Sequence, residues 1–369
     1  MLGLAPVVLI GVSLNDQQIY ILSIFDPTNY GNRLQACALE TMVAALTGKD
    51  VVSVDCRRPI PKRGIAKVIA DCNRTRIESK KAPVARRRRF RAFQTAHCAP
   101  VVEVAESEVC CIDAPVVIGS DQCWNPGWGL GASEFGAQCA VGVDRKMSYA
   151  ASFGICISDM PEGWGHRYSE WLSEIENIGV REFEGARIVR ELTGRSVKVV
   201  LDPTMLQTAE WWSEIEVRPI IPAVDLDRPF CLKYVLGDDS ASVKIAERCD
   251  CDDLELVDLT DIHLPVGPAE FVWLIHHSSL VCTDSFHATV FSLLFHRRFV
   301  IYERQGNARS MSSRFDTLDT MFGINSNRAG MECFDECHVD GFDWEGFERV
   351  LAQKRNDSIA WLRDGLASL

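Results

Sequence analysis

Short runs of aliphatic residues alternate along the chain with segments whose apolar positions recur every three or four residues. Each run is apolar at nearly every position, which is typical of strands in a parallel sheet covered on both faces. We expect strands at Ile19–Phe25, Val51–Asp55, Pro115–Gly119, Lys146–Ala151, Asn177–Arg181, Val197–Leu201, Pro229–Leu236, Leu254–Leu259, Ser279–Thr283 and Phe299–Glu303. The helical pattern is clearest at Asn32–Thr47, which Gly48 is expected to end. This alternation predicts an α/β fold with parallel sheets.

A proline-rich stretch divides the alternation in two. Glu216–Pro229 contains three prolines and mixed charges, which is typical of a linker. We therefore expect two Rossmann-like domains, residues 1–218 and 219–369, which face a cleft where ligands bind. The tail Asp343–Leu366 is expected to form one or two helices that pack back across that cleft.

Composition narrows the class of function. The net charge of −12 argues against a general nucleic-acid-binding protein. The 15 cysteines lack the paired spacing of zinc sites, so we expect free thiols and a cytoplasmic location. The apolar start, residues 1–16, is too short to span a bilayer and is expected to be an N-terminal extension or a first strand, with a signal peptide as the alternative.

One segment, residues 57–91, is strongly basic in this acidic chain and includes the four arginines Arg86–Arg89. In one interpretation it is a solvated helical hairpin whose Phe90 and Phe93 dock on the core. In the other it is a surface for anionic lipid head groups or a phosphate-linked acceptor, which would bring the protein to the inner membrane face. The sequence leaves both interpretations open.

Polar residues repeatedly follow the predicted strands at their carboxyl ends, where open α/β sheets bind ligands. Six such loops are Asn29–Gln35, Gly119–Pro126, Ser148–Gly154, Val180–Glu182, Leu201–Leu206 and Thr283–His287. In the last loop, Asp284 or Ser285 can cap the helix that begins next, and the N–H groups of its first turn form an anion site. His287 lies in that turn, where it adds a donor or a proton, or bonds a backbone carbonyl.

Together these loops resemble the polysaccharide pyruvyl transferase family. The matching stretches are NYGNRLQACAL, GSDQCWNP, YAASFG, REFEGARIVRELTG followed by VLDPTML, TDSFHATVFSLLF and SRFDTLDTMFGI, in the family's order over about residues 20 to 325. Two positions depart from the family pattern, because Ala288 stands where glycine is expected and Cys37 where an aromatic residue is common. The resemblance implies a fold similar to the glycosyltransferase-B type. It also implies transfer of a pyruvyl group from phosphoenolpyruvate to a saccharide, which forms a pyruvate ketal and releases phosphate.

The resemblance further implies roles for individual side chains. The expected catalytic residues are His287, Arg181 and Asp121. His287 is expected to act as an acid, a base or a phosphate ligand, and Arg181 to bind a carboxylate or phosphate of the donor at two points. Asp121 is expected to act as a base or to bind sugar hydroxyls. The expected donor-binding residues are Ser285, Asp284, Arg309 and Arg314. The expected acceptor-binding residues are Asn29, Asn32 and Gln122. We expect no metal ion and no cofactor besides the donor substrate.

Each of these roles has a structural alternative. Arg181 could form a surface salt bridge, His287 could cap a helix, and Asp121 could hold a loop. Trp124, Trp128 and Trp164 could stack on a sugar or belong to the core. Two other functions also stay open, another sugar-modifying transferase of the glycosyltransferase-B type and a non-catalytic member that binds glycans or phosphorylated metabolites. The expected partners are phosphoenolpyruvate and a saccharide acceptor, free or lipid-linked, and no nucleic acid.

Overall fold

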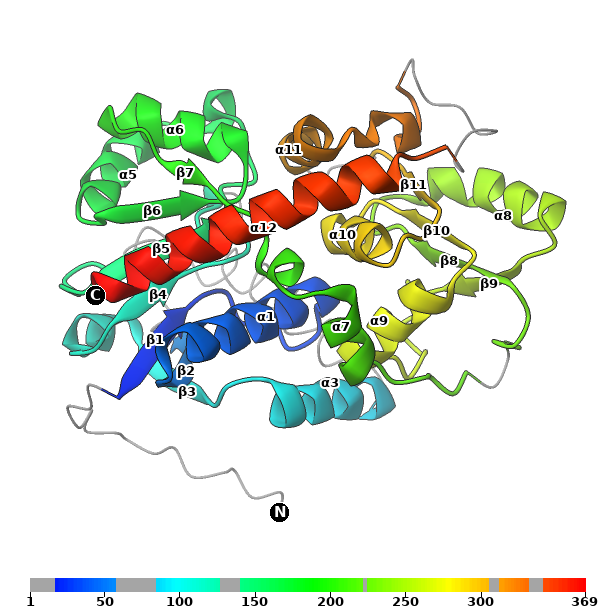
Figure 1. The fold of residues 1–369 in the computed structure, drawn as a ribbon, viewed down its shortest axis with the longest axis horizontal. Helices are drawn as coiled ribbons and strands as arrows, with labels where there is room; N and C mark the ends of the chain where they lie inside the picture. Colours follow the sequence, from blue (N-terminus) through cyan, green and yellow to red (C-terminus); the bar gives the residue numbers. More distant parts are fainter. Residues whose placement is uncertain (1–16, 58–83, 127–139, 222–223, 305–311, 332–340) are drawn as a thin grey trace, which may run out of the picture.

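The structure, a computed structural model, describes residues 17–57, 84–126, 140–221, 224–304, 312–331 and 341–369. Within these ranges the chain forms two parallel β-sheets flanked by helices (Figure 1). The first sheet has seven strands in the order β3-β2-β1-β4-β5-β6-β7, and the second has four in the order β11-β10-β8-β9. Both are doubly wound orders: successive strands are added first on one side of the first strand of the sheet and then on its other side. The predicted α/β class with parallel sheets is confirmed.

Every predicted strand region contains a strand, although most strands end before the apolar run does. The bounds are β1 Gln18–Leu22, β2 Asp50–Arg57, β3 Val101–Ala105, β4 Val116–Ile118, β5 Lys146–Ala151, β6 Asn177–Val180, β7 Lys198–Val199, β8 Phe230–Tyr234, β9 Glu255–Asp258, β10 Leu280–Thr283 and β11 Phe299–Ile301. β3 is absent from the predicted strands. It lies at the edge of the first sheet and exposes Glu103, so its sequence lacks the continuous apolar character of a covered strand.

The helices cover the faces of both sheets (Figure 1). Their bounds are α1 Tyr30–Thr47, α3 Val84–His97, α5 Trp164–Ser173, α6 Phe183–Thr193, α7 Ala209–Ile215, α8 Ser242–Cys251, α9 Pro268–His277, α10 Phe286–Leu294, α11 Ser312–Phe322 and α12 Trp344–Ala367. α1 starts earlier than predicted, because the side chain of Asn29 accepts a hydrogen bond from the Asn32 N–H as its N-cap. It ends as predicted at Gly48, whose φ of 65° is the left-handed value that glycine adopts without strain.

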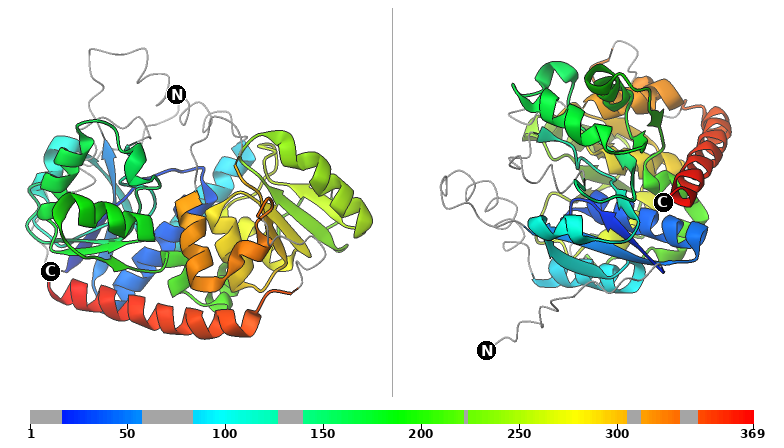
Figure 2. Two further views of the ribbon diagram at one scale, coloured as in Figure 1. Left: turned by 90° about the horizontal axis from the view of Figure 1, so that it is seen from above. Right: turned by 90° about the vertical axis from the view of Figure 1, so that its left-hand side faces the viewer.

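The predicted tail is a single helix, α12, that runs alongside both domains (Figures 1 and 2). Near its start, the ring of Phe347 packs against Phe322 with centroids 5.0 Å apart. Near its end, Trp361 lies against β5 and β6, so close to Gly179 that a Cβ there would lie 2.7 Å from the indole ring. The predicted border at residue 218 falls in the connection between α7 and β8, but the chain returns to the first domain through α12.

The two domains also meet through an aromatic contact between α1 and the second domain. Tyr30 is fully buried, stacks on Phe271 of α9 with ring centroids 4.7 Å apart, and donates its hydroxyl to the Val266 carbonyl at 3.2 Å. Phe90 of α3 lies 5.1 Å from the same tyrosine ring. This shared core fixes the N-terminal end of α1 against the second domain, which places the loops of both sheets face to face.

The described helices include none with the length and apolar composition that a bilayer crossing needs. In the basic segment, residues 58–83 lie outside the described residues, as does the apolar start. The described part, α3, docks through Phe90 and Phe93, each 3% exposed, which confirms that part of the first interpretation.

Candidate active site

Three charged side chains and a histidine, from three strand ends and one helix, meet between the domains. Asp121 follows β4, Arg181 follows β6, Asp202 follows β7, and His287 lies in the first turn of α10. Arg181 Nη1 lies 2.9 Å from Asp202 Oδ2, and Arg181 Nη2 lies 3.5 Å from Asp121 Oδ1. His287 Nε2 lies 3.6 Å from Asp202 Oδ2. We call these four residues the ionic cluster. It unites the three predicted catalytic residues with Asp202, to which the sequence analysis gave no role.

The position of the ionic cluster follows from the two sheet topologies. The strand order reverses between β1 and β4 in the first sheet and between β8 and β10 in the second. Ligands of doubly wound folds bind at such reversal points, outside the carboxyl ends of the strands. The loop after β4 carries Asp121, and the loop after β10 leads into His287. The ionic cluster therefore lies where both sheets offer a binding site.

The ionic cluster is buried but retains unused hydrogen-bonding capacity. Arg181 is 3% exposed, Asp202 2% and His287 7%. Among the described residues, Arg181 Nε and Nη2 and His287 Nε2 have no hydrogen-bond partner, because their nearest carboxylates lie beyond good hydrogen-bond distance. Buried polar groups are normally paired, so these nitrogens are available to a ligand.

Opposite charges keep the carboxyl groups of the ionic cluster ionised. Burial alone would raise the pKa of Asp202, but the His287 ring and the Arg181 guanidinium outweigh it and lower that pKa well below its ordinary value. The pKa of Asp121 is lowered likewise, since Arg181, His287 and a hydrogen bond from Asn32 overcome the effect of burial. In turn the two aspartates raise the pKa of Arg181 although burial opposes this.

Another charged group, Arg314 of α11, lies beside the ionic cluster. Its guanidinium carbon is 5.4 Å from the centre of the Phe286 ring, and that of Arg181 is 4.9 Å from the same ring. Burial and repulsion from Arg181 lower the pKa of Arg314 to about 9. Arg181 and Arg314 thus both lie near the Phe286 ring at the start of α10, and anion binding there stays a prediction. Arg309 lies outside the described residues.

A glycine at the start of α1 permits the two domains to meet at His287. A Cβ added to Gly31 would lie 2.0 Å from His287 Nδ1, which is closer than any atomic contact allows. The backbone of α1 thus forms one wall of the histidine site. This close approach explains why the NYGN stretch carries glycine there.

The predicted acceptor-binding residues Asn29, Asn32 and Gln122 all have partners within the protein. Asn29 caps α1. Asn32 Nδ2 donates to Asp121 Oδ2 at 2.8 Å, and its Oδ1 accepts from the backbone N–H of Asp26 at 2.9 Å. Gln122 is buried, and its Oε1 accepts from Asn125 Nδ2 at 3.2 Å. Asn29 and Asn32 thus order the loop before α1, and acceptor binding by the three residues stays a prediction.

The predicted donor-binding residues Ser285 and Asp284 organise the start of α10. Ser285 is the N-cap, and its side chain accepts from the Ala288 N–H at 3.5 Å. Asp284 accepts from the N–H groups of Leu236 and Gly237, each at 2.8 Å, and from Arg304 Nε at 2.9 Å. Asp284 therefore joins the loops after β8 and β10 and directs Arg304 to this edge of the sheet. Direct contact with the donor stays a prediction for both residues.

Glu182, next to Arg181, is another residue to which the sequence analysis gave no role. Its Oε1 accepts from Ser152 Oγ at 2.9 Å and from the N–H groups of Phe153 and Gly154 at 2.9 and 3.0 Å. It thereby fixes the loop after β5 beside the ionic cluster.

The structure places Trp124 in the core with its side chain fully buried, while Trp128 lies outside the described residues.

Away from this site, one group of side chains among the described residues has a geometry that suits a metal ion. Glu216 contacts His276 Nδ1 at 2.9 Å and His277 Nε2 at 3.1 Å. The group joins the connection after α7 to the end of α9 and lies outside the ionic cluster. The expectation of no metal stays a prediction.

Comparison with known proteins bears on the family and the fold. A family model described as polysaccharide pyruvyl transferase matches residues 29–306. No curated protein matches the chain. A crystal structure from Listeria monocytogenes, assigned as a UDP-N-acetylglucosamine 2-epimerase, superposes with a TM-score of 0.50 at 12% identity over 91% of each chain. Anabaena Alr3699/HepE in complex with UDP and glucose gives a TM-score of 0.46 at 10% identity over 96% of this chain and 100% of that one. The expected architecture of two Rossmann-like domains, similar to the glycosyltransferase-B type, is confirmed.

Proposed function

Because this chain belongs to the polysaccharide pyruvyl transferase family, we propose that it transfers the pyruvyl group of phosphoenolpyruvate to two hydroxyls of a saccharide. The products are a pyruvate ketal and inorganic phosphate. One observation carries the proposal, the convergence of Arg181, Arg314 and His287 at the buried start of α10.

The charges of the site support a donor that carries both a carboxylate and a phosphate. Arg181 and Arg314 both lie near the Phe286 ring, and Arg181 Nε and Nη2 have no hydrogen-bond partner among the described residues. A guanidinium can bind a carboxylate or a phosphate at two points. Burial and repulsion from Arg181 lower the pKa of Arg314, and a bound anion would favour its charged form.

The residues of the ionic cluster suit the chemistry of ketal formation. Protonation of the methylene carbon of phosphoenolpyruvate makes the adjacent carbon oxocarbenium-like, and the first sugar hydroxyl attacks it and loses its proton. The second hydroxyl then attacks the same carbon, and phosphate leaves with the bridging oxygen and the electrons of the C–O bond. One hydroxyl proton balances the new methyl group and the other leaves with phosphate. His287 beside Asp202 is the group that can exchange these protons, and Asp121 adds negative charge near the cationic carbon.

A reaction in heavy water tests the proposal. We expect a panel of free and lipid-linked saccharides, incubated with phosphoenolpyruvate, to include one that gains the mass of a ketal with deuterium in its methyl group. Oxygen label in the C–O–P bridge should end in inorganic phosphate, as mass spectrometry would show. A phosphorylated sugar with the label retained on pyruvate would contradict pyruvyl transfer and indicate phosphoryl transfer instead.

Gly31→Ala should impair the reaction without unfolding the protein. The new methyl group would displace the His287 ring, and a displacement of about 1 Å at a reacting group can cost roughly 10²-fold in rate. The matched control is Gly165→Ala in α5, whose Cβ would contact a single methyl group of Leu192 at 3.2 Å. Transfer rates of both variants measure the effect on the reaction, and thermal melting shows whether each variant is folded. Equal rates in the two variants would show that the position of His287 does not matter.

A further inference from the structure

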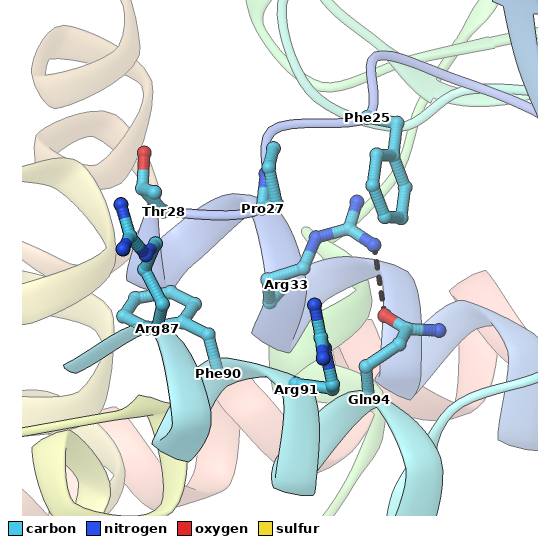
Figure 3. Close-up of a pocket in the computed structure, with 8 residues that line it drawn as sticks. All are labelled: Phe25, Pro27, Thr28, Arg33, Arg87, Phe90, Arg91 and Gln94. Carbon is cyan, nitrogen blue, oxygen red and sulfur yellow. Dashed lines mark hydrogen bonds between the residues drawn. The ribbon is translucent and has the colours of Figure 1, made fainter. Parts of the chain in front are cut away.

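A second basic site lies on the other side of α1 from the second domain's helix α10. It is a cavity of about 420 Å³ between the loop after β1, the start of α1 and the helix α3 (Figure 3). The side chains that matter for its chemistry are those of Phe25, Arg33, Arg87, Phe90, Arg91 and Gln94. The cavity thus combines three guanidinium groups with two aromatic rings.

Arg33 is a buried charge that forms no ion pair with any described residue. It is 3% exposed, and its guanidinium carbon lies 4.1 Å from the centre of the Phe25 ring. Its hydrogen bonds go to neutral amides, with Nη2 donating to Asn32 Oδ1 at 2.7 Å and Nη1 to Gln94 Oε1 at 3.1 Å. Within the described part of the chain it forms no ion pair, and burial lowers its pKa although the longer-range attraction of nearby carboxylates opposes this. Burying an unpaired charge is costly, and an anion bound in the cavity would offset that cost.

Helix periodicity divides the arginines of α3 between two environments. Arg86 lies over the Tyr30 ring, and Arg89 pairs with Glu270 at 3.2 Å, so both contact residues at the domain interface. Arg87 and Arg91 lie one turn apart and line the cavity with Phe90 between them. Figure 3 shows Arg91 extending from α3 toward Arg33 of α1. Three positive charges therefore surround one space.

The cavity is connected to the ionic cluster through a single side chain. Asn32 accepts from Arg33 through Oδ1 and donates through Nδ2 to Asp121 at 2.8 Å. Arg33 therefore lies two hydrogen bonds from Asp121 of the ionic cluster, and a ligand group bound at Arg33 lies three hydrogen bonds from it. The cavity is built by the first domain, whereas the start of α10 belongs to the second domain.

We propose that this cavity binds the phosphate group of a phosphorylated saccharide, which is the acceptor of the transfer reaction. Arg33, Arg87 and Arg91 hold the phosphate, and the group next to the phosphate lies against Phe25 and Phe90. Its nearness to Asp121 favours a phosphate that is attached to the sugar itself. This inference rests on the proposed function, because it takes the acceptor to be a saccharide.

Calorimetric titration with inorganic pyrophosphate tests the cavity directly. The protein is held in millimolar phosphoenolpyruvate without acceptor, so that the donor fills the site at α10. We expect Arg91→Gln to weaken pyrophosphate binding about tenfold, as the loss of one charge-assisted contact does, and Arg87→Gln with Arg91→Gln to weaken it further. The matched control is Arg88→Gln, an exposed arginine of α3 outside the cavity lining, which should bind like wild type. Absent binding, or equal affinity in Arg91→Gln and Arg88→Gln, would overturn the proposal.

Two further experiments distinguish a sugar phosphate from a lipid head group as the ligand, and the phosphate cavity from the proposed donor site. With acceptors from the saccharide panel, Arg91→Gln should lower kcat/KM about tenfold for phosphorylated sugars and leave it unchanged for phosphate-free sugars. If vesicles of phosphatidylglycerol instead bind in an Arg91-dependent manner while kcat/KM is unchanged, the ligand is a lipid head group and the saccharide assignment is wrong. If phosphoenolpyruvate fails to raise the melting temperature while pyrophosphate binding still depends on Arg91, the donor proposal fails and the phosphate cavity stands.

Discussion

Replacing His287 by glutamine is expected to lower the turnover of pyruvyl transfer by roughly 10² to 10⁴-fold, the usual contribution of a positioned acid or base. Glutamine keeps polar atoms beside Asp202 and fills a similar space, but it cannot take up and release a proton near neutral pH. The loss should appear in kcat, because Arg181 and Arg314 remain to bind the donor. Steady-state kinetics measure the loss of turnover, and the melting temperature in phosphoenolpyruvate measures donor binding.

The matched control for His287 is His296→Gln, just beyond the other end of the same helix. His296 Nε2 contacts Glu348 at 2.7 Å on the surface, so its loss should leave both kcat and KM unchanged. A His287→Gln enzyme with normal kcat and a raised KM would restrict His287 to holding the donor. Normal values of both constants would remove His287 from the reaction.

Much of the fold could be predicted because strands covered on both faces have an unambiguous pattern. β5 and β10 are buried at every position, and the predicted ranges match them closely. β3 escaped prediction because an edge strand does not need apolar residues at every position, and Glu103 interrupts its run. The ends of strands were the weaker part, since β1 stops at Leu22 where Ser23 Oγ instead bonds the Ser120 carbonyl at 2.8 Å.

The site could be located from sequence because polar loops gather at the carboxyl ends of parallel strands. The partners of each side chain could not, since they come from distant parts of the chain. Asp202 lies in a loop that the pattern singled out, yet only the fold brings it to Arg181 and His287. Conversely, Asn29 and Asp284 are polar residues of the kind that bind ligands, and the structure engages both in capping and loop contacts.

The basic segment shows how three-dimensional context changes an interpretation based on charge. Four consecutive arginines look equivalent in the sequence, but burial of Phe90 and Phe93 fixes the rotation of α3. Arg86 and Arg89 then face the second domain, and Arg87 faces the cavity. A test of anion binding by this segment should therefore alter Arg87 and Arg91 and spare Arg86 and Arg89, whose loss would disturb the domain interface.

Asp202→Asn is expected to destabilise the protein by about 3 to 5 kcal/mol, because removing one member of a buried ion pair leaves the remaining charge uncompensated. Arg181 and His287 would both lose their nearest anion, while an asparagine Oδ1 can still accept from the Thr204 N–H that Asp202 now engages at 3.0 Å. The matched control is Asp316→Asn, since Asp316 pairs with Arg328 at 2.8 Å but its side chain is 57% exposed. An exposed pair is worth about 1 kcal/mol or less. Thermal melting of both variants should therefore separate them widely.

The pH dependence of this difference distinguishes a lost charge from a lost contact. The folded state lowers the pKa of Asp202, so the unfolded state binds a proton more readily and the ionised carboxylate stabilises the fold. That stabilisation is complete above the ordinary aspartate pKa of about 3.9 and is lost as pH falls from there through the lowered folded-state pKa. The gap in melting temperature between wild type and Asp202→Asn should thus shrink as pH falls below about 4. A gap that persists unchanged at low pH would mean that Asp202 stabilises the fold through its hydrogen bonds to Thr204, and that its charge is not what holds Arg181 and His287 in place.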